Sequence, residues 1–280
     1  MATPFRGWEL NDAFVRALDF EEEQDEQSYE EDFKLEDQFI VRLSPDFKQK
    51  TISENEEFPK VSKLLITTDD ISAAFSDAYV LNRDDFVEIT GLVSGPYSPS
   101  KYGNTVHQNS FWDKTCFLYS FTNQPGIMIC QMKQQIDQKY MSIWASKVLS
   151  FIKPDHVIVL SSLSQCNVQM ENPVEEADFL CQLKTDAYNG ETCYPSLPKP
   201  TLVKDIPAAV LTYCQVHAIS AILYILVTEA HSFDVNAVKS FSPILKEDIF
   251  IDFGKIAENV VKEKLKKLCS MSIPSKGVYI

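Results

Sequence analysis

The sequence predicts an α/β protein, a three-layer α/β/α sandwich in which helices cover both faces of a mainly parallel sheet. Three observations support this fold class. Two segments of the chain each join a long amphipathic helix to a short apolar strand, the pattern of parallel crossover connections. The third observation is the run Ala221–Val227, which is apolar on both alternating faces and is therefore typical of a strand buried between two layers of helices.

The elements expected before the first crossover helix are mainly strands and loops. In chain order they are a buried strand at Lys63–Thr68, a helix through Ala73–Phe75, a loop at residues 94–110, and a hairpin with strands at Thr115–Tyr119 and Gly126–Cys130. Prolines and glycines predict the loop, and Thr122–Pro125 predicts the hairpin turn. We therefore expect the folded body to begin near residue 60.

The first crossover helix follows this hairpin. Apolar side chains recur on one face from Ile136 through Val148 to Ile152, over four turns. The helix is expected to end before Pro154, because proline cannot donate the hydrogen bond that a continued helix needs. His156–Leu160 then predicts the next strand of the sheet.

The second crossover helix is predicted to begin at Asp205, which we expect to cap it. Pro207 fits an early position in this helix, where no hydrogen-bond donor is lost. Val210 and Cys214 lie on its apolar face, and it leads into the strand at Ala221–Val227. A helix followed by a fully buried strand completes the second crossover unit.

Two further helices are expected around this unit. The first is started by Asn172-Pro173 and bears Ala177, Leu180 and Leu183; the last helix of the chain bears Ile256, Val260, Leu265 and Leu268 on one face. Lysines crowd the end of the last helix, where positive charge suits the helix dipole. Proline and glycine after that helix predict a short tether at the C-terminus.

Charge divides the chain into three parts. The net charge is −14, and residues 1–40 alone carry thirteen Asp or Glu against three Lys or Arg. So acidic a segment buries too little apolar surface to offset the entropy of ordering it. We therefore expect an acidic, largely disordered arm at residues 1–50, an α/β domain at 51–269 and a flexible tail at 270–280. An acidic arm repels phosphate, which argues against nucleic acid as a partner.

The remaining composition limits the cellular context. The 280 residues include no apolar run long enough to span a membrane and no visible secretory signal, so we expect no membrane insertion. Seven cysteines occur without a CxxC pair, which favours reduced thiols in the cytosol or nucleus.

No catalytic, cofactor-binding or metal-binding residues are predicted. Cys214 and His217 have a spacing that could face a metal, but nothing nearby completes a ligand set, so a core thiol and a surface or capping histidine are expected. In Gly91–Gly95 the serine lies one position late for a hydrolase nucleophile elbow, which predicts a strand end instead. Phosphate-binding glycine motifs are missing from the sequence.

The candidate binding site is the end of the chain, Val278-Tyr279-Ile280. A tyrosine combines a rigid apolar ring with a hydroxyl, and a free carboxylate adds a charge that no internal segment carries. A pocket with a lysine at its floor could bind both groups together. A disordered tail that ends in an arbitrary tyrosine is the alternative that these three residues alone leave open.

A longer stretch extends the argument. Asp205–Val216, followed by Ala221–Tyr224, closely resembles the proteasome assembly chaperone 1 family of alpha-ring assembly chaperones, and the similarity is strongest over residues 205–245. The resemblance implies a three-layer α/β/α fold and a non-enzymatic chaperone. It implies a heterodimer with proteasome assembly chaperone 2 that binds the proteasome alpha subunits, promotes ring formation and prevents off-pathway ring dimerisation.

The resemblance also gives the tail a role. The family motif is a hydrophobic residue, a tyrosine and any residue, which would place Val278, Tyr279 and Ile280 between adjacent alpha subunits. A cytoplasmic protein is implied, with the nucleus or endoplasmic reticulum as further compartments. Two alternatives are a regulator that docks on the mature proteasome core, and an α/β enzyme of the hydrolase or phosphorylase kind.

Overall fold

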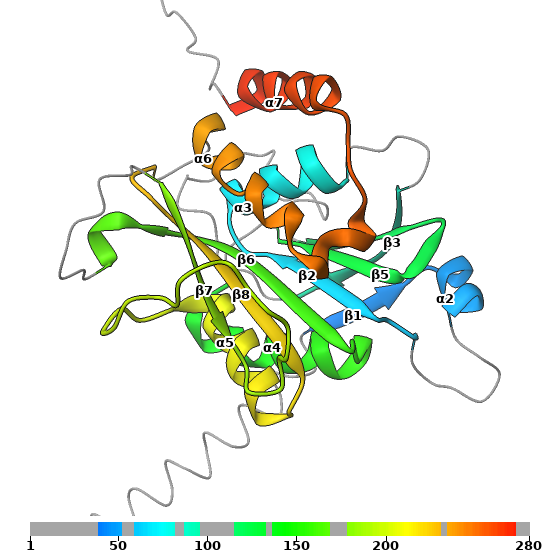
Figure 1. The fold of residues 1–280 in the computed structure, drawn as a ribbon. Helices are drawn as coiled ribbons and strands as arrows, with labels where there is room; N and C mark the ends of the chain where they lie inside the picture. Colours follow the sequence, from blue (N-terminus) through cyan, green and yellow to red (C-terminus); the bar gives the residue numbers. More distant parts are fainter. Residues whose placement is uncertain are drawn as a thin grey trace, which may run out of the picture.

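An eight-stranded sheet forms the centre of the computed structural model (Figure 1). The structure describes residues 39–51, 59–81, 87–95, 115–132, 136–168, 178–230 and 234–272. Across the sheet the strands lie in the order β1-β3-β4-β5-β2-β6-β8-β7. They are β1 (Ile40–Leu43), β2 (Lys63–Thr67), β3 (Val87–Ser94), β4 (Thr115–Phe121), β5 (Gln124–Gln131), β6 (His156–Ser164), β7 (Phe179–Lys184) and β8 (Ser220–Thr228).

The four central strands are parallel, as predicted, and antiparallel strands flank them on both sides, so the sheet is mixed with a parallel centre. β2 pairs in parallel with β5 on one side and with β6 on the other, and β6 pairs in parallel with β8. The outer strands β1, β3 and β4 form antiparallel pairs at one edge, and β7 is antiparallel to β8 at the other. The predicted hairpin is the β4–β5 pair.

Helices cover both faces of the sheet, so the three layers predicted from the sequence are confirmed. The helical segments are α2 (Pro45–Thr51), α3 (Asp70–Phe75), the π-helical turn η1 (Ser76–Val80), α4 (Gln138–Ile152), η4 (Gln165–Asn167), α5 (Asp205–Val216), α6 (Val235–Ser240), η5 (Ser242–Lys246), η6 (Asp248–Phe253) and α7 (Glu258–Ser272). In Figure 1, α4 and α5 lie below the sheet, and α3, α6 and α7 lie above it.

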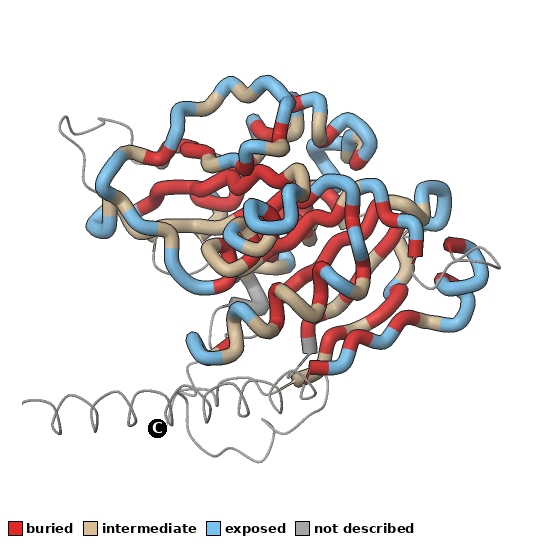
Figure 2. The backbone as a smooth tube through the Cα atoms, turned by 90° about the horizontal axis from the view of Figure 1, so that it is seen from below, coloured by how far each residue is buried: buried red, intermediate tan, exposed pale blue. Residues whose placement is uncertain are grey.

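Strand β8 contributes side chains to two hydrophobic cores, one on each face of the sheet. Leu223 and Ile225 pack in the cluster that contains α4 and α5, whereas Ile222 and Tyr224 pack in the cluster on the opposite face. Every residue of β8 after Ser220 is buried, because helices lie on both sides of the strand. Figure 2 shows the buried residues gathered in the interior of the molecule and the exposed residues toward its outside.

Helix α4 begins and ends close to its predicted limits. Trp144 and Val148 are fully buried on its apolar face. Lys153 adopts a left-handed conformation with φ 49°, and its N–H still donates to the carbonyl of Leu149. This turn redirects the chain ahead of Pro154 and into β6, the order that the sequence predicted.

The helix predicted to start at Asn172 is wrong where the structure describes it. Leu180 and Leu183 lie in strand β7, not in a helix, and pair with the edge of β8. The reason is tertiary, because an unpaired edge of a buried strand accepts a neighbour whatever its local helix propensity. The outer side of β7 is covered in turn, since the N–H of Gln182 donates to the carbonyl of Pro195 at 2.9 Å. Residues 169–177 lie outside the described part of the chain.

Asp205 does not cap α5, contrary to the prediction. Lys204 occupies the cap position and makes no side-chain capping bond, while Asp205 is the first helical residue and has φ 61°. The identity of the cap residue explains the missing bond, because the lysine ammonium group only donates and cannot accept a hydrogen bond from a helix N–H.

The ordered fold begins earlier than the expected boundary at residue 51. Ile40–Leu43 pairs with β3, and Phe39 and Phe47 are buried against the core. Residues 39–50, which we assigned to the acidic arm, therefore include an edge strand and most of a helix. Residues 1–38, with most of the acidic arm, and the expected loop residues 96–110 lie outside the described part of the chain.

Candidate functional site

The predicted tail residues Val278, Tyr279 and Ile280 lie outside the described residues, so the structure places only the helix that precedes them. That helix, α7, carries Val261 and Leu265 buried in the core on the upper face of the sheet. Leu265 and Leu268 pack on the core as predicted, but Ile256 precedes the helix and Val260 is 37% exposed. The helix is anchored on the domain and continues to Ser272, so residues 270–272, which we assigned to the flexible tail, are helical.

The exposed side of α7 is charged. Lys262 Nζ lies 2.7 Å from Glu258 Oε1, one turn apart along the helix. The hydrogen bond and positive charge of Lys262 lower the pKa of Glu258. Both side chains are well exposed, so this pair contributes little to stability and mainly keeps the surface of the helix hydrated.

A second candidate site is a crevice of about 610 Å³ at the carboxyl ends of the parallel strands. Thr68 and Asp69 follow β2, Met132 follows β5, and Ser161 and Ser162 belong to the last part of β6. Parallel strands present their carboxyl ends at one edge of the sheet, so residues far apart in the sequence meet there. The first residues of α4 and α5 form the opposite wall.

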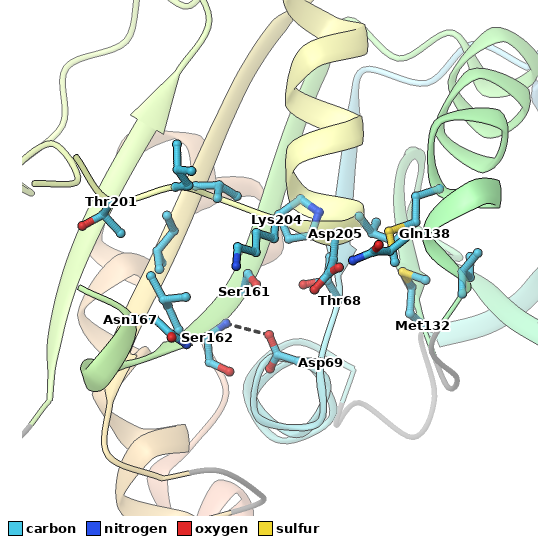
Figure 3. A pocket seen from close by; sticks show the side chains of 18 of the residues that line it. Thr68, Asp69, Met132, Gln138, Ser161, Ser162, Asn167, Thr201, Lys204 and Asp205 are labelled. Carbon is cyan, nitrogen blue, oxygen red and sulfur yellow. Dashed lines mark hydrogen bonds between the residues drawn. The ribbon is translucent and has the colours of Figure 1, made fainter. Parts of the chain in front are cut away.

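Asp69 holds one wall of this crevice in place (Figure 3). Its Oδ1 accepts a hydrogen bond from the N–H of Ser72 at 2.9 Å, which caps α3. Its Oδ2 accepts from the N–H of Ser162 in β6 at 2.6 Å. One carboxylate therefore joins the start of α3 on the upper face to strand β6, the neighbour of β2 in the sheet.

Apolar and polar side chains both line the crevice. Its apolar side chains are Met132, Ile136, Met141, Leu163, Val203, Ile206 and Ile225. Figure 3 shows Gln138 and Asp205 on the helical side, with Asn167 and Thr201 toward β6 and β7. The sequence did not predict a site at these residues. The one feature that could have indicated it is their position, directly after buried strands or at the start of crossover helices.

The Cys214–His217 spacing does not form a site. Cys214 is buried in the core, and burial raises the pKa of its thiol to about 12. His217 lies at the end of α5 with its ring 4.1 Å from the ring of Tyr213. Among the residues that the structure describes, no group of three or more His, Cys, Asp or Glu side chains could hold a metal ion. Gly91 and Ser94 lie in β3, as the predicted strand end requires.

A cluster of tyrosines near η6 is a further feature that the sequence did not predict. Tyr224 of β8 packs edge-on against Tyr194 with ring centroids 5.8 Å apart. Burial, followed by the charge of Glu247, raises the pKa of Tyr194 to about 12. Tyr224 is fully buried and Tyr194 partly buried, and both keep their protons at neutral pH, so the cluster is a part of the core with polar hydroxyl groups.

These features define a class of protein: a three-layer α/β domain with a crevice at the carboxyl ends of its central strands and an amphipathic helix that leads to its C-terminal segment. A family model described as "Proteasome assembly chaperone 4", with the short name PAC1, matches residues 1–280. The chain therefore belongs to the proteasome assembly chaperone family, whose members are chaperones and not enzymes.

Individual relatives agree with this assignment. A protein from Nematostella vectensis named Proteasome assembly chaperone 1 is 26% identical over 263 residues, which cover 91% of this chain and 100% of the relative. The human protein of the same name is 28% identical over 234 residues, covering 80% of this chain and 78% of the relative.

Solved structures share the fold at low sequence identity. Pyrococcus furiosus PbaA, described as an archaeal homolog of proteasome-assembly chaperone, has a TM-score of 0.52 at 10% identity and covers 83% of this chain and 91% of its own. Pyrococcus furiosus PbaB, described as an archaeal proteasome activator, has a TM-score of 0.52 at 9% identity, with coverage of 84% and 97%. None of the helices in the described ranges has the length and apolarity needed to cross a membrane.

Proposed function

We propose that this protein is an assembly chaperone of the 20S proteasome core particle. It pairs with a second chaperone of the proteasome assembly chaperone 2 kind, and the heterodimer binds the ring of alpha subunits, promotes its formation and prevents off-pathway ring dimerisation. The observation that carries the proposal is the family match over residues 1–280, supported by relatives named Proteasome assembly chaperone 1. The proposed compartment is the cytoplasm, with the nucleus or endoplasmic reticulum in addition.

The proposed contact with the alpha ring is the tail. Burying the Tyr279 side chain removes up to about 200 Å² from water, which is worth roughly 5 kcal/mol at most. Ordering the backbone of three residues costs on the order of 3–6 kcal/mol, so these two terms nearly cancel. A charge-assisted bond to the carboxylate of Ile280 then decides the sign, and the tail alone binds weakly.

A weak tail becomes effective when the domain docks beside it. A short tether keeps the local concentration of the tail near the millimolar range once the larger surface is bound. The anchoring of α7 supports this arrangement, because Val261 and Leu265 hold the base of the tether on the domain. We expect Val278 to supply the apolar contact and Tyr279 the buried ring.

The test is a pull-down of alpha subunits with the intact chain and with a chain that lacks residues 278–280. We expect the deletion to weaken capture at least tenfold while the melting temperature stays unchanged. Tyr279→Ala should reproduce most of the loss, and Tyr279→Phe, which keeps the ring, should retain most of the binding. Unchanged capture by the deleted chain would remove the tail from the proposal.

The same pull-down distinguishes the assembly chaperone from a regulator of the finished particle. Mass spectrometry of the captured material identifies either a half-built alpha ring or a complete core with its beta subunits. The chaperone proposal requires the first. Recovery of only complete cores would replace it with the second function.

A further inference from the structure

We infer that the crevice at the carboxyl ends of β2, β5 and β6 is a binding site for a small organic molecule that is neutral or positively charged and has an apolar body. This inference does not depend on the proposed role in proteasome assembly. It rests on the position, size, lining and rigidity of the crevice.

Its position is the first argument. The chain that leaves β2 enters α3 on the upper face of the sheet, whereas the chain that leaves β5 enters α4 on the lower face. β2 and β5 are neighbours, so the connections diverge between them and open a gap at their carboxyl ends. Open α/β sheets bind their ligands at such switch points.

The size and lining fit a small organic molecule. Ligand pockets are typically about 300–1,000 Å³ and are mostly apolar with a few placed polar groups. This crevice, about 610 Å³, falls within that range of volume, and its lining mixes apolar side chains such as Met132, Met141 and Leu163 with at least as many polar groups. Hydroxyl and amide groups of Ser161 and Gln138 lie where they can bond a polar group on the ligand (Figure 3).

The walls are held before any ligand arrives. The N–H of Thr68 donates to the carbonyl of Leu160 at 3.2 Å, and the N–H of Met132 donates to the carbonyl of Thr67 at 3.2 Å. Together with the bond from Ser162 to Asp69, these contacts join β2, β5 and β6 at the crevice. A preformed site loses less conformational entropy on binding, so these bonds favour affinity.

Charge selects the class of ligand. Among the described residues that line the crevice, three carry carboxylates (Asp69, Asp137 and Asp205) and one, Lys204, carries an ammonium group. A ligand that carries phosphate or sulfate meets a net negative surface and is repelled, whereas an amine or an uncharged molecule is not. Asp137 makes no side-chain capping bond at the start of α4, so the backbone amides of that helix do not occupy its carboxylate.

The test is ligand-observed NMR with the full chain and a fragment library divided into neutral, cationic and anionic sets. We expect hits from the neutral and cationic sets and few from the anionic set. Ser161→Phe should fill the crevice and weaken those hits at least tenfold. Ser150→Phe, at an exposed position on α4, is the matched control and should leave them unchanged.

A second variant protects the test if Ser161→Phe does not fold. Asp137→Lys changes a partly exposed side chain and should weaken cationic hits several-fold while neutral hits persist. The inference is overturned if the neutral and cationic sets give no hits, if hits survive in folded Ser161→Phe, or if Asp137→Lys leaves the cationic hits unaltered.

Discussion

The carboxylate of Asp69 accepts a hydrogen bond from the backbone N–H of Ser162 at 2.6 Å, across 93 positions of sequence. The same side chain caps α3 through the N–H of Ser72. A residue directly after β2 therefore fixes both the helix that follows it and the neighbouring strand β6. This double role makes Asp69 the residue on which the geometry of the crevice most depends.

Asp69→Ala should destabilise the protein by about 2–4 kcal/mol. Loss of a helix cap costs about 1 kcal/mol, and leaving the Ser162 N–H without its acceptor adds about 1–3 kcal/mol. The matched control is Asp234→Ala, because Asp234 caps α6 through the N–H of Ala237 and, within the described residues, its side chain makes no hydrogen bond to a strand. Its cost should be about 1 kcal/mol. Urea unfolding measures both, and equal losses would contradict the role of the Ser162 bond.

Gly91→Ala should loosen the edge of the sheet. A Cβ at Gly91 would lie 2.4 Å from the carbonyl oxygen of Arg42, which belongs to the backbone of β1 and cannot move without breaking the β1–β3 pair. Gly126→Ala is the control, since its nearest contact would be the Ser62 hydroxyl at 3.4 Å. Hydrogen exchange of the β1 amides should accelerate at least tenfold in the first variant and stay unchanged in the second.

Cys193 should react slowly with iodoacetamide for a residue on the surface. The charge of Glu247, followed by its hydrogen bond, raises the pKa of the Cys193 thiol and reduces the reactive thiolate. Glu247→Gln removes the charge and should speed alkylation of Cys193 several-fold at pH 8. Peptide mass spectrometry follows both this site and exposed Cys166, the internal control. If the alkylation rate of Cys193 is the same with Glu247→Gln, the charge of Glu247 is not the cause of its slow reaction.

Stability should fall between about pH 10 and pH 12. Burial, followed by the charge of Asp77, raises the pKa of Tyr119 to about 12, and Tyr194 reaches about the same value. Because the folded-state pKa lies above the ordinary value of 10.0, the stabilisation is fully present below pH 10 and is lost as the pH rises through the folded pKa. Urea midpoints at pH 9 and 11.5 measure the loss. Tyr119→Phe with Tyr194→Phe should reduce it, whereas an undiminished loss would point to other groups.

The sequence predicted the elements whose own pattern determines them. Helix α4 repeats apolar residues over four turns, and β8 is apolar from Ala221 to Val227, so neither needs tertiary information to be assigned. The segment Phe179–Lys184 is different, because its leucines fit a helix face or a strand equally well. Pairing with β8 decides the matter, and that neighbour comes 36 or more positions later in the chain.

The candidate sites show the same limit. The tail motif is local and was found in the sequence, but its binding role stays a prediction because residues 278–280 lie outside the described part of the chain. The crevice is not local, since Asp69, Ser162 and Lys204 come from three separate segments. Only the topology brings them together, and no spacing between them carries that information.

The insertion of β8 between β6 and β7 affects how the protein is made. β8 is the last of the eight strands to be synthesised, yet it pairs with both β6 and β7, which emerge before it. At about 5–20 residues per second, a ribosome needs about 2–9 s to extend the chain from Lys184 to Thr228. During that interval the edges of β6 and β7 that will pair with β8 have unpaired backbone groups, and we expect general chaperones of the cell to protect them from aggregation.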